Sequence, residues 1–478
     1  MGLWPFGGKK PRGPVVIPGG GAGAQGQAGG PMRISGASGT KIITCPYCFS
    51  RFPHDEVHFK AMTLKEADGW ESAHDDFGVD DDDFDPFGDV NKEDENENSE
   101  DKSVARLFEE REDPLFKKFW DRYANELDWQ YANYPVLTRD DPRMLGGSYR
   151  CDADGMVDSV VDFYGMETKE RICPHCHNPL PPNYGKYKVH FIATVGITSS
   201  GKTVYLSQLL RRMDEYMSNV NLVTFDMTPA NERFLEEHPV ELDIPLPQGT
   251  APGALSAPLF YVILDKNEYH TLVFYDVAGE NCVIADEMSK YGAFIKNADG
   301  IIMILDPDQF SIVNTSRDKV VSPKAVVEAM FNSFLGSRGS GPSGIPLALA
   351  LSKSDKLEGH ELISPSSNIF KNIQYDERRP GFDVQQYNNL MGEVRMFLKG
   401  TSEGKSTMIA MNHCFSNTGL FAFSALNCDV KEDEKDIDGE VKKVAVPTAH
   451  PSPRRIEEPL LWLLSEFGII PKLTQTRR

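Results

Sequence analysis

The segment from Lys188 to Thr203 constrains the fold more strongly than any other part of this sequence. Its first half, Val189–Val195, is almost continuously apolar and β-branched, which is typical of a strand buried on both faces of a parallel sheet. Its second half fits G-x-x-x-x-G-K-[ST], a loop whose backbone N–H groups turn inward around a phosphate. Apolar residues then recur at helical spacing from Leu206 to Met217. Strand, loop and helix together predict a phosphate-binding loop, with the positive end of the helix facing the phosphates.

The phosphate loop and the later segment LVFYDVAGE predict a site for phosphate and magnesium. Lys202 would reach the β- and γ-phosphates, and the hydroxyl of Thr203 would hold Mg²⁺. Asp276, at the tip of a predicted strand, would hold Mg²⁺ through water, and the N–H of Gly279 would meet a γ-phosphate. The expected nucleotide-binding residues of the loop are Gly196, Ile197, Thr198, Ser199, Ser200, Gly201, Lys202 and Thr203.

Two later segments predict that the base is guanine. In Ser352-Lys353-Ser-Asp355, the carboxylate of Asp355 would accept hydrogen bonds from N1–H and N2–H of guanine, a pair of donors that adenine lacks. The stem of Lys353 would lie along the base. In Ser424-Ala425-Leu426, the N–H of Ala425 would meet guanine O6. Each segment alone also fits an ordinary strand end, but their order after the predicted strands favours guanine recognition.

Two cysteine pairs predict a zinc site. Cys45-Pro-Tyr-Cys48 and Cys173-Pro-His-Cys176 are matching C-P-x-C turns, and two such turns complete a tetrahedral set of ligands. We interpret the long gap between them as an insertion into a zinc ribbon. A redox C-x-x-C is the alternative, but it needs one pair and not two. Four neighbouring histidines are expected at the surface and not as ligands; they are His54, His58, His175 and His177.

Charge and composition disfavour several classes of protein. Most of the formal net charge of −21 comes from the acidic run between Asp75 and Asp101. The remainder is mildly acidic, so binding of nucleic acid or of anionic membranes is not expected. No apolar run approaches the roughly 20 residues of a membrane-spanning helix, and the N-terminus lacks an apolar signal segment. We therefore expect a cytoplasmic protein that does not insert into membranes.

Changes in composition divide the chain into regions. The acidic insertion carries Phe77, Phe84 and Phe87 and is either a solvated loop or a partner-binding segment. The expected regions are a disordered Gly/Pro-rich tail (1–40), two halves of a zinc ribbon (41–60 and 171–185), an acidic disordered insertion (61–113), a partly helical insertion (114–170), a P-loop domain with enlarged loops (186–472) and a tail (473–478).

The expected fold class is α/β, of the P-loop nucleoside-triphosphatase type. We expect a six-stranded, mostly parallel sheet with one antiparallel edge strand. The expected strands are Val189–Val195, Leu259–Leu264, Thr271–Asp276, Ile301–Leu305, Leu347–Leu351 and Leu420–Phe423. The expected helices are Lys202–Met217, 283–296, 323–335, 383–399 and Ile456–Phe467. Residues 219–257 and 428–452 are among the expected enlarged loops.

The order GITSSGKT, DVAGE, SKSD and SAL resembles the translation-factor and Ras-like (TRAFAC) class of P-loop GTPases, over residues 186–470. With CPYC, RICPHCHNPLP and RRIEEPLLWLL, the chain also resembles bacterial zinc-ribbon GTPases of the double-GTPase group. The resemblance implies GTP and GDP as ligands and a regulatory role in a multi-gene system. In this sequence Ser352 replaces the usual Asn or Thr of the base motif, which removes a side-chain brace.

The resemblance also implies two further site residues. Glu280 takes the place of the Gln that orients the attacking water in Ras-like members, so hydrolysis without a partner is expected to be slow. A threonine of switch I is expected on Mg²⁺, and we prefer Thr250 to Thr228 because it lies shortly before the predicted hairpin.

Together these features predict a GTP-binding and GTP-hydrolysing switch with a structural zinc ribbon. Catalysis would combine positioning with charge neutralisation by Lys202 and by Mg²⁺, with water held near Gly279 and Glu280. No arginine finger is recognisable, so a protein partner is expected, such as a second GTPase or an activating protein. Two alternatives stay open: an ATP-using kinase or ATPase, and a nucleotide-binding scaffold with little turnover whose zinc ribbon binds protein or nucleic acid.

Overall fold

A computed structural model describes most of the chain after position 40. The described residues are 41–61, 113–123, 125, 129–141, 144, 147–162, 165–197, 199–226, 228–247, 255–266, 268–278, 285–310, 321–334, 341–437 and 440–474. The expected tail 1–40 and the expected acidic insertion up to residue 112, apart from residue 61, lie outside them. Within these ranges, no helix combines the length and the apolar character that crossing a membrane requires.

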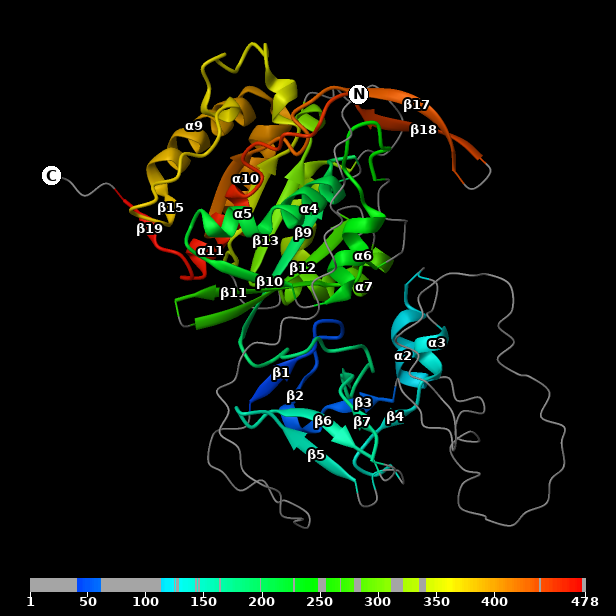
Figure 1. The fold of residues 1–478 in the computed structure, drawn as a ribbon. Coiled ribbons are helices and arrows are strands. Elements are labelled where there is room, and N and C mark those ends of the chain that lie inside the picture. The colour runs from blue at the N-terminus through cyan, green and yellow to red at the C-terminus, as the bar shows by residue number, and fades with distance from the viewer. Residues whose placement is uncertain are drawn as a thin grey trace, which may run out of the picture.

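A seven-stranded sheet forms the centre of the larger part of the molecule (Figure 1). In spatial order its strands are β10 (Val223–Asp226), β11 (Leu259–Asp265), β12 (Glu268–Ala278), β9 (Lys188–Gly196), β13 (Gly300–Leu305), β14 (Leu347–Leu351) and β16 (Thr418–Ala422). The last five are parallel to one another, whereas β11 is antiparallel to both of its neighbours. This order places β9, and the phosphate loop that follows it, in the middle of the sheet.

The expectation of six strands with an antiparallel strand at the edge is wrong. All six expected strands are present, but β10 is a seventh and pairs with β11, beginning with Val223 opposite Leu264. The antiparallel strand β11 is therefore second from the edge. β10 lies in the stretch 219–257 that was expected to be a loop. It has four residues and its Val223 is 53% exposed, so it lacks the buried face that would mark it in the sequence.

Helices cover both faces of the sheet. On one face lie α4 (Lys202–Arg211), α5 (Met213–Ser218), α6 (Pro229–Glu237) and α11 (Glu458–Glu466). On the other lie α7 (Ala285–Lys296), α8 (Pro323–Phe334), α9 (Val384–Gly400) and α10 (Ser402–Cys414). Successive residues of β9 point to opposite faces of the sheet, so Ile192 packs with the first set of helices and Ala193 with the second. The continuous apolar character of β9 follows from this double burial.

A smaller part of the molecule lies below the sheet in Figure 1 and is built from both sides of the acidic segment. Its strands are β1 (Ile42–Thr44), β2 (Arg51–Pro53), β3 (His58–Lys60), β4 (Val136–Leu137), β5 (Ser148–Cys151), β6 (Val157–Val161), β7 (Glu167–Thr168) and β8 (Arg171–Ile172). They form a β1–β2 hairpin and two three-stranded sheets, β4-β3-β8 and β5-β6-β7. The region 114–170 thus supplies four strands in addition to two short helices, α2 (Pro114–Trp120) and α3 (Trp129–Asn133).

Aromatic side chains join the smaller part to the sheet. Phe49, just after the first cysteine pair, packs against Phe191, Tyr275 and Phe294, with ring centroids 5.3 to 5.8 Å apart. These contacts belong to one apolar cluster that runs from the cysteine turns through the face of the sheet covered by α7 and α8. The two parts therefore share a core.

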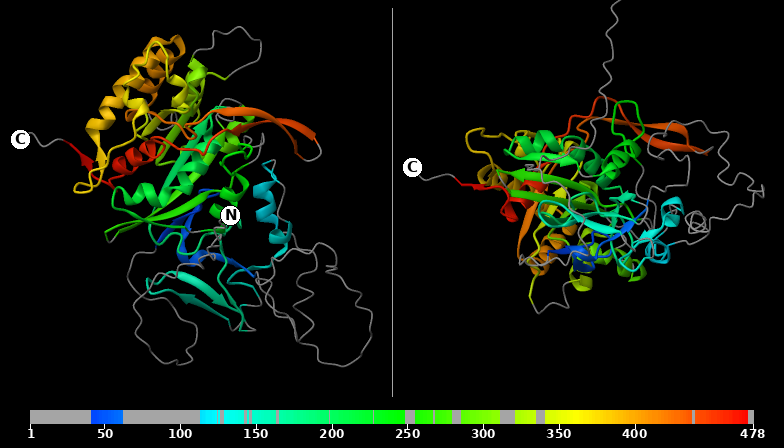
Figure 2. Two further views of the ribbon diagram at one scale, coloured as in Figure 1. Left: turned by 45° about the horizontal axis from the view of Figure 1, so that its top comes forward. Right: turned by 60° about the horizontal axis from the view of Figure 1, so that its bottom comes forward.

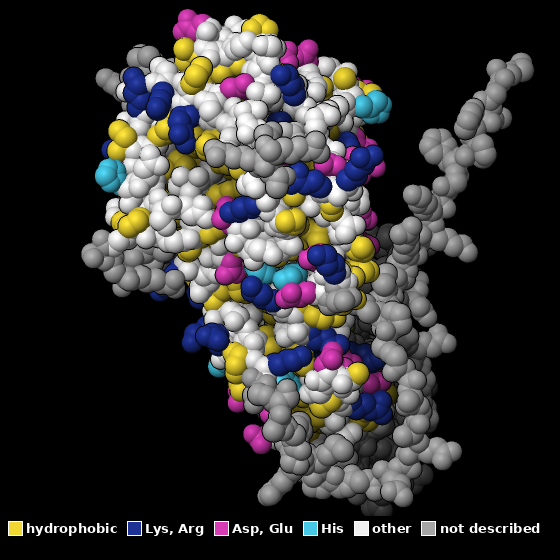
Figure 3. Space-filling view, turned by 90° about the vertical axis from the view of Figure 1, so that its left-hand side faces the viewer, with side chains coloured by type: hydrophobic (Ala, Val, Ile, Leu, Met, Phe, Trp, Pro, Cys, Tyr) yellow, Lys and Arg dark blue, Asp and Glu magenta, His cyan; other side chains and the backbone are white. Residues whose placement is uncertain are grey.

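Two strands project from the body near the carboxyl ends of the parallel strands (Figures 1 and 2). They are β17 (Val430–Ile437) and β18 (Glu440–Pro447), which pair antiparallel and which we name the arm. A further pair, β15 (Phe382–Asp383) with β19 (Lys472–Leu473), ties the end of the chain to the start of α9. On the face shown in Figure 3, Lys and Arg side chains lie among Asp and Glu side chains over both parts of the molecule.

Candidate functional site

The phosphate loop leaves β9 at the carboxyl ends of the parallel strands, where ligands bind in open α/β sheets. Gly201 has a φ of +80°, the left-handed conformation that favours glycine, and it precedes α4. A Cβ on Gly196 would lie 2.5 Å from Ser200 Oγ and 3.2 Å from the carbonyl oxygen of Ile304. Both glycines of the motif are therefore required by the backbone that is present.

Lys202 and Asp276 form an ion pair, with 2.8 Å between Nζ and Oδ1. The parallel pairing of β12 with β9 sets Asp276 opposite Thr194 and so brings its carboxylate to the loop. The two side chains are 10% and 2% exposed. Removing one partner of such a pair leaves the other charge buried, which is costly. The structure thus brings together the residue expected on phosphate and one expected on magnesium, with Thr203 buried in the first turn of α4.

Lys353 connects the predicted base segment to the phosphate loop. It follows β14 and has a φ of +50°. Its Nζ donates to the carbonyl oxygen of Ser199 (2.7 Å) and pairs with Asp306 Oδ2 (2.6 Å). Asp306 is not among the site residues predicted from the sequence. The available signal was its position directly after the buried strand β13, at the same edge of the sheet as the loop.

Asp355 and Ser424 meet although they lie far apart in the sequence. The Ser424 hydroxyl donates to Asp355 Oδ1, and the N–H of Asn427 donates to Ser424 Oγ (2.8 Å). Ser352 turns the other way and donates its hydroxyl to the carbonyl oxygen of Leu305 (3.2 Å). The two predicted base segments are therefore neighbours. The Ser352 hydroxyl does not support Asp355; it links the end of β14 to the end of β13.

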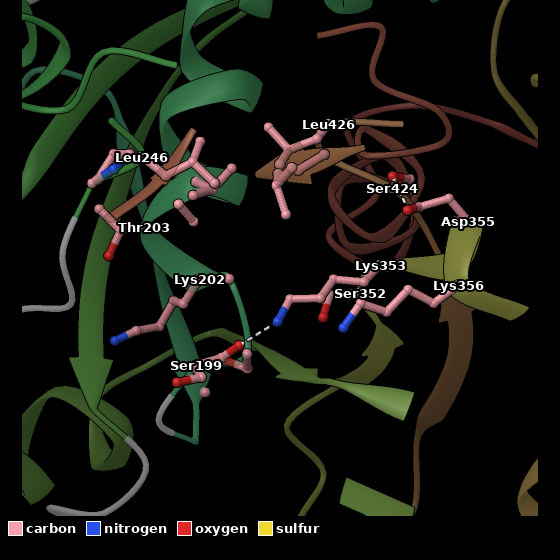
Figure 4. A pocket seen from close by; sticks show the side chains of 18 of the residues that line it. Ser199, Lys202, Thr203, Leu246, Ser352, Lys353, Asp355, Lys356, Ser424 and Leu426 are labelled. Carbon is pink, nitrogen blue, oxygen red and sulfur yellow. Dashed lines mark hydrogen bonds between the residues drawn. The ribbon is translucent and has the colours of Figure 1, made fainter. Parts of the chain in front are cut away.

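A cavity of about 850 Å³ joins these segments, within the range of roughly 300–1,000 Å³ that is usual for small-molecule sites. Figure 4 shows Lys202 and Thr203 toward one end, Asp355 and Ser424 toward the other, and Lys353 between them. The predicted residues that line it are Gly196, Ile197, Ser199, Ser200, Gly201, Lys202, Thr203, Ser352, Lys353, Asp355, Ser424, Ala425 and Leu426.

Two unpredicted segments complete the wall of this cavity. They are residues 246–247 before the expected switch I threonine, and the end of the arm nearest the sheet, with Val430 from β17 and Lys443–Ala445 from β18. Both lie in the stretches 219–257 and 428–452, which the sequence predicts to be loops. The three valines of VKKVAVP were the available signal for a strand, because β-branched residues are enriched in strands.

Four predicted site residues lie outside the described part of the chain. They are Thr198 of the phosphate loop, the switch I candidate Thr250, and Gly279 and Glu280 after β12.

The four predicted zinc ligands lie together, with all Sγ atoms within 4.8 Å of one another. The Sγ atoms of Cys45 and Cys176 are 3.6 Å apart, and those of Cys48 and Cys173 are 3.8 Å apart. These distances are too long for disulfides, in which sulfur atoms lie about 2.05 Å apart. Tetrahedral zinc with Zn–S bonds of about 2.3 Å places its sulfur ligands about 3.8 Å apart. The cluster fits that geometry.

The two cysteine turns have the same backbone conformation. The N–H of Cys45 donates to the carbonyl oxygen of Ser50 (2.9 Å), and the N–H of Cys173 donates to the carbonyl oxygen of Asn178 (3.0 Å). The residues after the second cysteines, Phe49 and His177, have φ values of 57° and 52°. Burial and the neighbouring thiols raise the pKa of Cys45. Four thiolates in this position therefore need a cation, which this arrangement could hold as Zn²⁺.

The expectation that the neighbouring histidines lie at the surface is wrong for His177. This side chain is buried, and its Nδ1 lies 2.7 Å from Asp113 Oδ1 and its Nε2 3.3 Å from His58 Nδ1. Lys60, which is fully buried, pairs with the same carboxylate at 3.1 Å. Burial alone would raise the pKa of Asp113, but the hydrogen bond from His177 and the charge of Lys60 hold it below its ordinary value. The network ties α2 to the second cysteine turn.

A protein of Mycolicibacterium smegmatis named "Putative ESX-1 scaffolding and assembly protein SaeC" is 24% identical to this chain over 333 residues. The match covers 63% of this chain and 80% of the relative. No family model matches the chain.

Among solved structures, the chain is similar to SsGBP in complex with GDP (14% identity, TM-score 0.22) and to sup35 in complex with GMPPNP (11% identity, TM-score 0.22). Each match covers 50% of this chain, but only 45% and 38% of those chains. This chain thus spans less than half the length of either structure. A TM-score of 0.22 is too low to support an inference about function.

Proposed function

We propose that this chain binds GTP and GDP with Mg²⁺ and acts as a GTP-hydrolysing switch of the TRAFAC class, within the double-GTPase group. The observation that carries the proposal is the hydrogen bond from Ser424 to Asp355 in the cavity that also holds the phosphate loop. Those two residues are 69 positions apart. A phosphate site alone would suit any nucleotide, whereas a carboxylate oriented at the other end of the cavity suits guanine, which offers it two N–H donors.

The residues have distinct roles in this proposal. The loop from Gly196 to Thr203 and the Lys202 ammonium bind the phosphates, and Thr203, Asp276 and Thr250 would hold Mg²⁺, which neutralises charge on the phosphates. Asp355 accepts from the base, with Ser424 orienting its carboxylate. The remaining proposed contacts are Ser352, Lys353, Ala425 and Leu426 around the base, and Gly279 and Glu280 near the attacking water.

We also propose that Cys45, Cys48, Cys173 and Cys176 bind a structural Zn²⁺. The division of the chain into a zinc ribbon (41–60 and 171–185) and a GTPase domain (186–472) is part of this proposal, as is a cytoplasmic location. The similarity to a protein named for scaffolding and assembly supports a role in assembling or regulating a multi-protein system, with a protein partner that accelerates slow hydrolysis. An ATP-using enzyme and a scaffold with little turnover are the alternatives.

A nucleotide-affinity panel tests the proposal. Dissociation constants for GTP, GDP, ATP and ADP are measured by calorimetry with Mg²⁺, on the wild type and on Lys202→Ala. We expect guanine nucleotides to bind more tightly than adenine nucleotides by about 10⁴-fold, and Lys202→Ala to weaken both. Equal affinity for GTP and ATP would favour the ATP-using alternative. Tight GTP binding without phosphate release, alone or with copurifying proteins, would favour the scaffold.

A further inference from the structure

The segment that carries the arm begins and ends beside the serine that holds Asp355. The N–H of Ser424 donates to the carbonyl oxygen of Arg454 (3.0 Å), and the N–H of Arg454 donates back to Ser424 (2.8 Å). One step further out, the N–H of Ser452 donates to the carbonyl oxygen of Leu426 (2.8 Å). The chain from 424 to 454 is therefore closed at its two ends, and the arm stands directly on the base end of the cavity.

The near end of the arm is held over the cavity by residues that precede the expected switch I threonine. Leu246 N–H donates to the carbonyl oxygen of Ala445 (2.8 Å), and Asp243 N–H donates to that of Pro447 (3.2 Å). Lys431 of β17 lies 3.5 Å from the Asp243 carboxylate. Residues 243–246 thus extend the arm by a third short segment, and this segment and the arm share one wall of the cavity.

This wall is mostly apolar, with Lys443 as its charged member. Its apolar residues include Leu246, Leu426, Val430, Val444 and Ala445, which we name the roof. In Figure 4, Leu426 lies across the cavity from Lys353, whose Nζ reaches down to the phosphate loop. The space between the roof and the Lys353 stem has Asp355 and Ser424 at one end.

The composition of the arm indicates that further packing on the roof would stabilise the arm. A two-stranded hairpin is marginally stable by itself. Of the eight residues in each strand of the arm, six are charged in β17 (VKEDEKDI) and three in β18 (EVKKVAVP). Val430 lines the cavity and is 47% exposed. A flat, partly apolar surface such as a purine base with its ribose would remove this side chain from water and add packing to the base of the arm.

We propose that the roof packs on the nucleoside of the bound nucleotide, so that the arm is part of the binding site and is ordered by guanosine and not by phosphate. The inference rests on the proposed function. It makes Val430 a nucleoside-binding residue on an element outside the phosphate loop and the two predicted base segments.

Two measurements on the full chain test the inference. The first is GDP affinity with Mg²⁺ for Val430→Ser, with Val223→Ser as the matched control. Both valines are exposed on strands, at 47% and 53%, but Val223 lies on β10 and does not line the cavity. We expect Val430→Ser to weaken GDP binding about fivefold, as for loss of one apolar contact, and Val223→Ser to leave it unchanged.

The second measurement is amide hydrogen exchange in residues 430–437 and 440–447, with GDP or with inorganic pyrophosphate as the probe. We expect GDP to slow exchange in the arm and pyrophosphate, which lacks a nucleoside, to leave it unchanged. Equal GDP affinity for the two valine variants would overturn the inference, as would equal protection by pyrophosphate. If the wild type binds GDP tightly, either of these two results leaves the proposed function intact. If the wild type does not bind GDP, the inference and the proposed function are both refuted.

Discussion

The hydroxyl of Tyr275 donates a hydrogen bond to the backbone carbonyl oxygen of Pro46, 2.7 Å away. Pro46 lies between the two cysteines of the first turn, and Tyr275 immediately precedes Asp276 on β12. Successive strand residues point to opposite faces, so β12 presents a tyrosine to the cysteine cluster and a carboxylate to the phosphate loop. Adjacent residues of one strand therefore connect the candidate metal centre to the candidate nucleotide site.

This hydrogen bond gives the first prediction. Tyr275→Phe leaves the buried Pro46 carbonyl without this donor, so the free energy of unfolding should fall by about 1–2 kcal/mol. Tyr205→Phe is the matched control, because Tyr205 is also fully buried but its hydroxyl has no hydrogen-bond partner among the described residues. That change should be neutral or stabilising. Denaturant unfolding of both variants measures the difference, and equal losses would contradict the prediction.

The second prediction concerns the metal. Elemental analysis should find about one zinc per chain, and Cys173→Ser should lose it because a three-sulfur site binds less tightly than a complete one. Since the cysteine turns share an apolar cluster with the sheet, the melting temperature of the whole chain should fall. Cys151→Ser, at an exposed cysteine outside the cluster, should keep both the zinc and the stability. Full zinc content in Cys173→Ser would contradict the proposed ligand set.

The third prediction tests the position of Lys353. Asp306 is buried and holds the Lys353 ammonium at 2.6 Å, while Asp308 pairs with Lys356 at 3.2 Å and is 67% exposed. Asp306→Asn removes the charged one of the two contacts that position the Lys353 ammonium, the other being the Ser199 carbonyl. It should weaken GTP binding about tenfold, because hydrogen bonds between charged groups are stronger than neutral ones. Asp308→Asn should change affinity little, as is usual for surface pairs. Titration calorimetry of the two variants decides between these outcomes.

The fourth prediction concerns the base. Asp355→Asn replaces an acceptor by an amide, so guanine loses a partner for N2–H while xanthine, with an oxygen at C2, gains a donor. The variant should prefer xanthosine triphosphate to GTP, with Mg²⁺ dependence unchanged. Competition binding measures the two affinities. A variant that does not discriminate in favour of xanthine would mean that Asp355 does not contact the base.

The fifth prediction concerns pH and depends on His190. This side chain is buried on β9, stacks on Phe467 and contacts His270 (3.3 Å between ring nitrogens). Burial, with the charges of Lys188 and His270, lowers the pKa of His190 from 6.5 to about 4. The unfolded chain therefore binds more protons than the folded chain between these values, so stability falls as the pH falls through this window.

His190 alone should remove up to about 3 kcal/mol from the free energy of unfolding between pH 6.5 and 4. His270, whose pKa is also lowered by burial, adds to the same trend despite its neighbour Glu268. Denaturant unfolding at several pH values should show a smaller slope for His190→Gln and the wild-type slope for His413→Gln, an exposed histidine on α10. An unchanged slope in His190→Gln would refute the assignment.

The parts of the site that the sequence predicted are those with a local pattern. The phosphate loop is encoded in eight consecutive residues, and Gly201 adopts the φ that its motif implies. The two C-P-x-C turns match in sequence and match in backbone. The two base segments were each predicted from their place after a strand, and they are neighbours because the parallel strands β14 and β16 end at one edge of the sheet. The hydrogen bond between Ser424 and Asp355 was not predicted.

The missed parts depend on contacts between distant segments. The roof requires residues 243–246 to pair with β18, and no local pattern in either segment specifies that pairing. The helix α10 was missed because its buried residues include Thr407, Ala410 and Cys414, which are too small or polar to form an apolar stripe. Asp306 has a recognisable position, but its partner Lys353 comes from another strand end.

The separation of the two cysteine turns has a consequence for biosynthesis. Cys48 and Cys173, whose sulfur atoms lie 3.8 Å apart, are 125 positions apart in the chain. At about 5–20 residues per second, the first turn is synthesised roughly 6 to 25 seconds before the second. Two thiols cannot satisfy a four-coordinate ion, so the proposed zinc site is complete only when residue 176 has been added. β9 follows from residue 188, but its partners in the sheet, β12 and β13, begin only at residues 268 and 300. The four cysteines are therefore all available for a metal before the central strand of the sheet has a neighbour to pair with.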